Sequence, residues 1–241
     1  MRRNHHDDDH VVPEAHVARN IVKDNPYDCG LTLASHHFDT QTLDPAYGVY
    51  HNTVTGNTSS GNGTKTGEGA GVGLFAGPPG AQTYGNVVVD NILVHNGLPG
   101  VAMHSHVFNQ NLNGNSIVGN RIADDGPDGD PGTIVPAGIA IFSDDTGGAA
   151  PIMDTVIAQN VFGQEGIDVA VKTPGSVDAH LNSFLDAVGV SNLGSGPVYA
   201  TENWWGCSRG PGSPGCATVA GTNVRTDPWL ERPSMPMLAT H

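Results

Sequence analysis

The chain has 241 residues, of which 33 are glycine and 19 are asparagine, and its formal net charge is −14. Helix-forming residues are too scarce for a helical bundle, and the 37% share of hydrophobic residues argues against disorder. There is no basic stripe to bind nucleic acid and no apolar run of the roughly 18 residues needed for a membrane span, so we expect neither a nucleic-acid partner nor membrane insertion.

The first fifteen residues differ in composition from the rest of the chain. They contain a histidine- and aspartate-rich run at residues 5–10, and they lack the apolar stretch of a signal peptide. We expect residues 1–15 to form an N-terminal His/Asp-rich segment or a cap on the domain that follows.

A short phrase organises residues 16–206: a polar residue, an asparagine and then, in most copies, apolar residues. Successive copies lie 21 to 40 residues apart, and a second polar residue follows five positions after most of these asparagines. The asparagines of the phrase are Asn20, Asn52, Asn91, Asn120, Asn160, Asn182 and Asn203, and the second polar residues are Asn25, Asn57, Asn96, Asp125 and Glu165.

Each copy continues with a glycine and a short apolar alternation. These strands begin after Gly30, Gly71, Gly100, Gly138, Gly166 and Gly189. Short strands with a period of two residues, separated by glycine and asparagine, predict the coils of a parallel β-solenoid. Glycine and asparagine supply the left-handed backbone that tight corners need, and asparagines in register can form a hydrogen-bonded ladder.

This pattern over residues 16–206 resembles the right-handed parallel β-helix repeat proteins, the pectate-lyase-like superfamily. The resemblance implies an all-β fold: a right-handed, single-stranded parallel β-helix (β-solenoid) of about seven coils with long loops on one side. Residues 207–241 would form a C-terminal loop and tail that close the last coil. No catalytic motif of a known subfamily is complete, because the only match to the polygalacturonase-type motifs is the Asp144-Asp145 pair.

Two cysteines near the C-terminus bracket a loop of glycine, proline, serine and arginine. We expect a disulfide between Cys207 and Cys216, because nothing else in the sequence would hold this loop. A disulfide favours an oxidising compartment, so we expect a secreted or periplasmic protein.

The strand after the repeated glycine is flanked by the longer insertions, so we expect it to form the floor of a groove. Laid on one another from their glycines, the strands place two outward columns along this floor. The first column is Ala34, Phe75, His104, Phe142 and Ala170, and the second is His36, Gly77, His106, Asp144 and Lys172.

Titratable side chains of three kinds therefore converge on the groove. Histidine and aspartate can exchange protons with a substrate, and a lysine can stabilise developing charge. The predicted catalytic residues are His106, Asp144, His36, His104, Asp145 and Lys172, and the predicted substrate-binding residues are Phe75, Phe142, His37 and Trp204.

The acidic loop after residue 123 suggests a weaker metal site. Asp125 and Asp128 are the predicted ligands, and Ca²⁺ is the candidate cation. His104 and His106 could be either a base or a metal pair, and Zn²⁺ or Cu²⁺ is the less favoured candidate cation.

The predicted function is that of a secreted β-helix protein that cleaves a polysaccharide or oligosaccharide by hydrolysis or elimination. The groove for it is lined by His36, His104, His106 and Asp144. The net charge of −14 favours a neutral glycan over a polyuronate. Two alternatives remain open at this point: a non-catalytic glycan-binding or cell-surface β-solenoid, and a periplasmic metal-handling β-helix protein.

Overall fold

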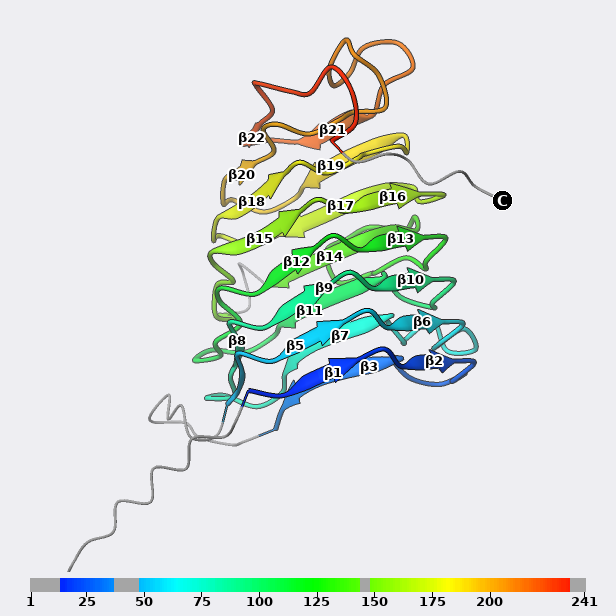
Figure 1. Cartoon of the computed structure of the whole chain (residues 1–241). Coiled ribbons are helices and arrows are strands. Elements are labelled where there is room, and N and C mark those ends of the chain that lie inside the picture. Colours follow the sequence, from blue (N-terminus) through cyan, green and yellow to red (C-terminus); the bar gives the residue numbers. More distant parts are fainter. Residues whose placement is uncertain (1–13, 37–47, 144–147, 235–241) are drawn as a thin grey trace, which may run out of the picture.

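The computed structural model describes residues 14–36, 48–143 and 148–234. All regular secondary structure in these residues is β-strand, and the strands build long parallel sheets (Figure 1). The part of the chain so described contains no helix with the length and apolar character of a membrane span.

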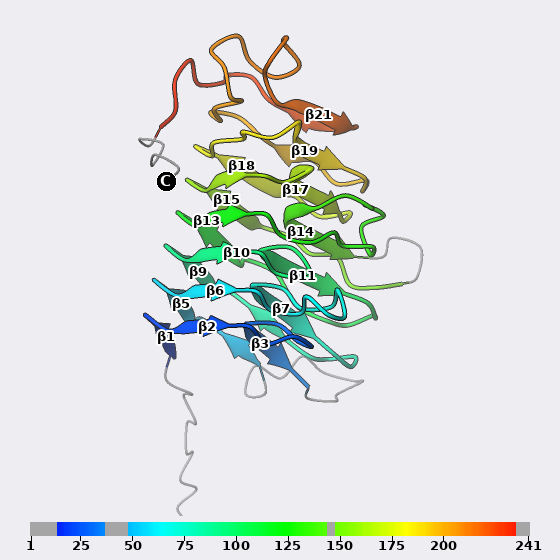
Figure 2. The same ribbon diagram turned by 90° about the vertical axis from the view of Figure 1, so that its right-hand side faces the viewer.

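Three sheets run along the length of the molecule, and in each sheet the strands are stacked along this same direction (Figures 1 and 2). Sheet A contains β1 (His16–Ala18), β5 (Thr53–Thr55), β9 (Val87–Val89), β12 (Ser116–Val118), β15 (Thr155–Ala158), β18 (Val177–His180), β20 (Val198–Tyr199) and β22 (Val224–Arg225). Sheet B contains β2 (Ile21–Lys23), β6 (Thr58–Ser60), β10 (Ile92–Val94), β13 (Arg121–Ala123) and β16 (Val161–Gly163). Sheet C contains β3 (Leu31–Ser35), β7 (Val72–Ala76), β11 (Val101–Ser105), β14 (Ala137–Ser143), β17 (Ile167–Lys172), β19 (Val188–Asn192) and β21 (Thr218–Gly221). A short fourth sheet pairs β4 (Val49–Tyr50) with β8 (Thr83–Tyr84).

The chain visits sheets A, B and C in the same order again and again. One pass is β1, β2 and β3, the next is β5, β6 and β7, and each strand pairs in parallel with its counterpart in the next pass. Figure 2 shows the strands of sheet C one above the other. The predicted all-β fold with stacked parallel strands is confirmed.

The core lies between the three sheets and is built from columns of identical strand positions. In sheet A one inward column is Val54, Val88, Ile117, Ile157 and Ala179, all buried. Along sheet B the column ends in aromatic rings, where Phe184 lies 5.7 Å from Phe162 and 4.8 Å from Trp205 between ring centroids. Burial of such large side chains contributes about 1.5–3 kcal/mol each, so the columns stabilise every pass.

Asparagine ladders follow the corners between the sheets. In most rungs the backbone N–H and the side-chain Nδ2–H of one asparagine donate to Oδ1 of the next, as from Asn57 to Asn91 at 2.9 Å for both bonds. The longest ladder is Asn20, Asn57, Asn91, Asn120, Asn160, Asn182 and Asn203. A second ladder contains Asn52, Asn86 and Asn115, and a third contains Asn25, Asn62, Asn96 and Asp125.

The ladders correct the predicted register of one repeat. The repeated phrase groups Asn52 with Asn20 and Asn91, and Asn57 with the second polar residues, and both predictions are wrong by five residues. The second pass carries an asparagine at each of three successive corners, Asn52, Asn57 and Asn62, and Thr53-Val54 resembles the apolar residues of the other copies. The true counterpart, Asn57, is followed by the more polar Thr58-Ser59-Ser60, which pairs with Ile21-Val22-Lys23.

The predicted pairing of β17 with β14 also needs correction. Ile139 pairs with Val169 and Phe142 pairs with Lys172, which is a shift of two residues from the alignment of the two glycines. Lys172, not Ala170, therefore lies in the outward column of His104. The two glycines are not equivalent: Gly138 lies within its strand against Phe162, whereas the Gly166 N–H bonds to the Pro136 carbonyl before β17 begins.

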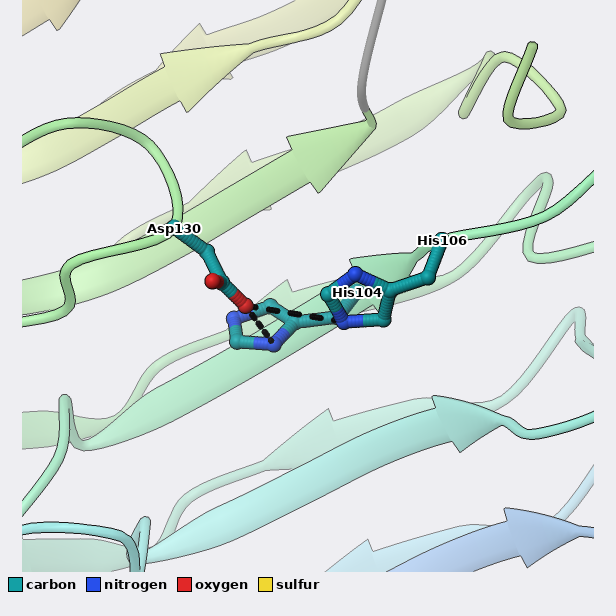
Figure 3. A group of neighbouring side chains, drawn as sticks. All are labelled: His104, His106 and Asp130. Carbon is teal, nitrogen blue, oxygen red and sulfur yellow. Dashed lines mark ion pairs between the residues drawn. The ribbon is translucent and has the colours of Figure 1, made fainter. Parts of the chain in front are cut away.

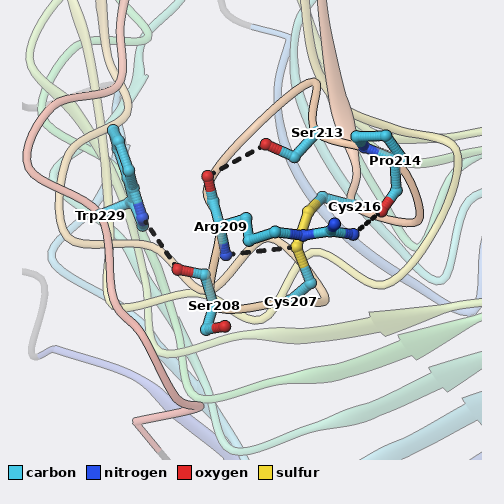
Figure 4. Close-up of a disulfide and its surroundings, with 7 residues drawn as sticks. All are labelled: Cys207, Ser208, Arg209, Ser213, Pro214, Cys216 and Trp229. Carbon is cyan, nitrogen blue, oxygen red and sulfur yellow. Dashed lines mark hydrogen bonds between the residues drawn. A yellow bond between two sulfur atoms is a disulfide. The ribbon is translucent and has the colours of Figure 1, made fainter.

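The C-terminal segment covers the last pass (Figure 1). Cys207 and Cys216 form the predicted disulfide, and the loop between them is tied by bonds from Arg209 to Pro214 and from Ser213 to the Arg209 carbonyl (Figure 4). The Trp229 indole N–H donates to the Ser208 carbonyl at 3.4 Å. The disulfide loop then leads into β21, which pairs with β19 at the end of sheet C.

Candidate functional site

The outward row on sheet C joins five strands. Strand pairing places Phe75 between Ala34 and His104, and Phe142 between His104 and Lys172. The Lys172 Nζ lies 5.4 Å from the centre of the Phe142 ring. Phe142 is almost fully buried, so it supports the side chains around it, whereas Phe75 is half-buried and accessible.

Two more histidines border this row. The ring of Phe75 is 6.0 Å from His36 and 6.4 Å from His106, between centroids. His106 also lies 5.5 Å from His104 and 5.4 Å from Phe142. The three histidines and two phenylalanines thus form one continuous strip of rings on the outer face of the sheet.

A groove of about 560 Å³ opens at this strip. Its floor includes Thr32 from β3, Phe75 from β7 and Ala102 from β11, and His36 and His104 also line it. Its sides are formed by residues that precede the strands, with Asp28, Glu68 and Leu98 among them. Sheet C therefore carries a groove that crosses several passes.

The loop between β13 and β14 brings two carboxylates to His104. Asp128 Oδ2 lies 2.7 Å from His104 Nε2, and the Asp128 and His104 side chains are only 3% and 14% exposed. Asp130 Oδ2 lies 3.2 Å from His104 Nδ1 and 3.5 Å from His106 Nε2. Figure 3 shows Asp130 reaching from this loop toward the two imidazoles.

Local hydrogen bonds hold the loop in this conformation. The Asp130 N–H donates to Asp128 Oδ1 at 3.0 Å, and the Thr133 hydroxyl donates to the Asp128 carbonyl at 2.8 Å. This aspartate turn leaves Asp128 Oδ2 free to accept from His104. The sequence showed an acidic loop but did not reveal that Asp130 faces the histidines, because that contact depends on how the loop folds back over β11.

The predicted site residues fall into three groups. His36, His104, His106, Phe75, Phe142 and Lys172 share the outer face of sheet C. Trp204 lies elsewhere, since it bridges Ser183 in continuation of sheet B. His37, Asp144 and Asp145 lie outside the described residues.

The two predicted metal ligands are placed in different surroundings. Asp125 accepts the Asn96 backbone and side-chain N–H groups, both at 2.8 Å, at the end of the third ladder. Asp128 instead contacts His104. Among the described residues, the group with metal-ligand geometry is His104, His106 and Asp130, whose ligand atoms lie within 4.8 Å of one another.

Buried carboxylates continue the third ladder. The Asp125 N–H donates to Glu165 Oε1 at 3.2 Å, and burial raises the pKa of Glu165 to about 8. Burial, followed by the neighbouring Asp186 carboxyl, also raises the pKa of Asp168 well above its ordinary value. The raised pKa values favour the protonated form of both carboxyls in the folded chain. Glu165 belongs to the ladder corner, and neither residue lines the groove.

The site can support two kinds of chemistry. An imidazole beside a carboxylate can transfer protons, and two imidazoles with a carboxylate can bind a transition metal. Both interpretations of the site are based on its residues alone, because no family model, curated protein or solved structure matches this chain.

Proposed function

We propose that this chain is a secreted or periplasmic right-handed parallel β-helix protein of about seven coils that cleaves a polysaccharide in the groove on sheet C. The repeated passes through sheets A, B and C and the seven strands of sheet C support this architecture. The disulfide between Cys207 and Cys216 supports an oxidising compartment.

One observation carries the proposal. His104 lines the groove and, at the same time, contacts the buried carboxylate of Asp128 at 2.7 Å. A histidine held in this way has a fixed ring orientation, which is what proton transfer to or from a bound substrate requires. Phe75 on the floor offers an apolar face against which a sugar ring can pack.

Both reactions of a glycosidic bond need an acid and a base. The leaving glycosidic oxygen takes up a proton, and the base removes a proton from water in hydrolysis or from a sugar carbon in elimination. His106 is 40% exposed and adjoins the Asp130 carboxylate, so it is accessible for one of these transfers, while His104 provides the other. His36 borders the groove beyond Phe75 and contacts substrate in this proposal.

The test is a panel of neutral and acidic polysaccharides, read both by new reducing ends and by the absorbance of unsaturated products. Reducing ends without unsaturation mean hydrolysis, and both signals mean elimination. His104→Gln and His106→Gln should lower turnover at least tenfold. His95→Gln is the matched control, because His95 also pairs with an aspartate, Asp124, at 2.6 Å, but follows β10 outside the groove.

Binding without turnover would favour the second candidate, a non-catalytic glycan-binding β-solenoid. The groove and Phe75 support that candidate as well. Turnover that is equal in the wild type, in His104→Gln and in His106→Gln would overturn the catalytic proposal, as would a panel with neither binding nor turnover.

A further inference from the structure

We propose that His104, His106 and Asp130 form a binding site for one divalent transition-metal ion of the zinc class, and that Asp128 orients His104 in it. The inference concerns the same two histidines as the proposed function, but it does not require that the chain cleave a glycan. A bound ion would occupy the nitrogen lone pairs that proton transfer uses, so the metal-bound chain and the chain that transfers protons are different states.

The three ligand groups converge from two elements. His104 belongs to β11 and His106 follows its end, and residues two apart on an extended strand project to the same face. Asp130 approaches from the loop above them, so that one ligand atom of each residue lies within 4.8 Å of the others (Figure 3). Two imidazoles and one carboxylate with an open fourth position are a common ligand set for zinc.

The distances suit a shared metal better than direct hydrogen bonds. Charged N–H···O bonds are about 2.7–2.9 Å long. Asp130 Oδ2 is 3.2 Å from His104 Nδ1 and 3.5 Å from His106 Nε2. In a tetrahedral site with Zn–N and Zn–O bonds of about 2.0–2.2 Å, neighbouring ligand atoms are about 3.3–3.5 Å apart. The two observed separations bracket this edge length.

Asp128 determines which nitrogen of His104 can bind the ion. Its Oδ2 accepts the Nε2–H at 2.7 Å, which leaves the Nδ1 lone pair directed toward Asp130. A proton on Nδ1 would bridge His104 and Asp130 only, whereas one cation would bridge Asp130, His104 and His106 together. A buried carboxylate behind a ligating histidine is the usual support of a metal-bound imidazole.

The chemistry of the ligands selects the class of ion. Ca²⁺ takes six to eight oxygen ligands, and this group offers one carboxylate and two nitrogens. Imidazole nitrogen suits zinc, copper and nickel. His106 and Asp130 are 40% and 44% exposed, which gives an ion access from solvent, and the net charge of −14 raises the local concentration of cations.

The experiment is a titration of the EDTA-stripped chain, without any glycan, with Zn²⁺ by calorimetry and with Co²⁺ by visible absorption, in which a tetrahedral site gives intense bands. The expected result is one tight site whose affinity falls at least tenfold in His106→Gln and in Asp130→Asn. Asp128→Asn should weaken it about 10- to 100-fold, as expected for a residue that orients a metal ligand.

His95→Gln and Asp124→Asn are the matched controls, because this exposed pair has one imidazole and one carboxylate at 2.6 Å. Both should bind metal as the wild type does. Equal binding by the wild type and the site variants, or equal losses in the controls, would overturn the site, and so would the absence of tetrahedral Co²⁺ bands. Thermal unfolding of each variant verifies that it is folded.

The two proposals can fail separately. If the chain binds metal but does not cleave glycans, the metal-site proposal stands, the proposed reaction is wrong, and the metal-handling alternative is supported. If the chain cleaves glycans in a way that depends on His104 but binds no metal, the proposed reaction stands and the metal-site proposal is wrong.

Discussion

Asp128 Oδ2 and His104 Nε2 lie 2.7 Å apart, and the aspartate side chain is only 3% exposed. Residues 24 positions apart in sequence thus join the floor of a groove to the loop that folds over it. Both imidazole nitrogens of His104 face a carboxylate, because Asp130 Oδ2 is 3.2 Å from Nδ1. This relationship makes His104 the most constrained histidine of the site.

The first prediction is that Asp128→Asn affects function more than stability. The amide keeps the size of the side chain but removes its charge, so His104 loses its ionic partner and its fixed ring orientation. We expect glycan turnover to fall about 10- to 100-fold and the free energy of unfolding to fall by about 1–3 kcal/mol. Turnover and urea unfolding measure the two effects.

Asp124→Asn is the control for this substitution. Asp124 pairs with His95 at 2.6 Å, but both side chains are more than half exposed, so the change should leave turnover and stability nearly unaltered. Equal effects of the two substitutions would show that the groove gives His104 no special role.

The second prediction concerns the longest asparagine ladder. Asn120 Oδ1 accepts the Asn91 backbone and side-chain N–H groups at 2.9 and 3.0 Å, and Asn120 Nδ2 donates to the Val88 carbonyl. Asn120→Ala removes these partners in the fully buried interior, and each unsatisfied group costs about 1–3 kcal/mol. We therefore expect stability to fall by about 3–5 kcal/mol in equilibrium unfolding.

Asn25→Ala is the internal comparison. Asn25 stands at the end of the third ladder, is half-buried, and its side chain donates to the Cys29 carbonyl at 3.1 Å. This variant should lose about 1 kcal/mol. If Asn25→Ala lost as much stability as Asn120→Ala, the contribution of a ladder asparagine to stability would not depend on whether it lies in the interior of the ladder or at its end.

The same ladders show how far the sequence predicts this fold. Asparagines, glycines and apolar alternation are periodic, so the stacked parallel strands and the outward column Phe75, His104 and Phe142 could be predicted. The register of single passes could not, because Asn52 and Asn57 both stand at corners and only strand pairing distinguishes them. Side-chain period fixes which residues alternate, whereas it does not fix where each strand starts.

The sequence predicts the site residues that lie on strands, but not those that lie on loops. His104 and His106 follow from strand periodicity, but the contact of Asp130 with both depends on a turn closed by Asp128 and Thr133. Lys172 was placed two positions too far along its strand, since Gly166 is a corner and Gly138 is not.

The third prediction is that the disulfide stabilises only the C-terminal end. Cys207 and Cys216 close a loop with a sequence separation of 9, which corresponds to about 2–3 kcal/mol of chain entropy. Reduction, or the double substitution Cys207→Ser and Cys216→Ser, should expose the last pass to proteolysis. The earlier passes should stay protected, because each pass contacts only its neighbours.

Limited proteolysis with mass spectrometry, with and without reductant, checks this result. Cys29→Ser is the control, since Cys29 is a free thiol outside the loop, and this variant should respond to reductant as the wild type does. Loss of protection throughout the chain on reduction would contradict the prediction.

The fourth prediction is a pH dependence of stability that originates in Glu165. Its pKa is about 8 in the folded chain, against an ordinary value of 4.5, mainly because of burial. Between these values the folded chain holds a proton that the unfolded chain has released, so stability falls as pH rises from about 4.5 to 8 and levels off above that. The slope from this one group reaches at most about 1.4 kcal/mol per pH unit.

Glu165→Gln should remove this share of the slope. The amide can still accept the Asp125 N–H through Oε1, but it has no charge to bury. We expect the variant to match the wild type near pH 4 and to be the more stable of the two at pH 8, in urea unfolding measured across that range. The exposed Glu231→Gln should follow the wild type at every pH. Glu165→Gln could instead be no more stable than the wild type at pH 8. That result would mean that ionising Glu165 in the folded chain costs no stability, and that water reaches the ladder corner.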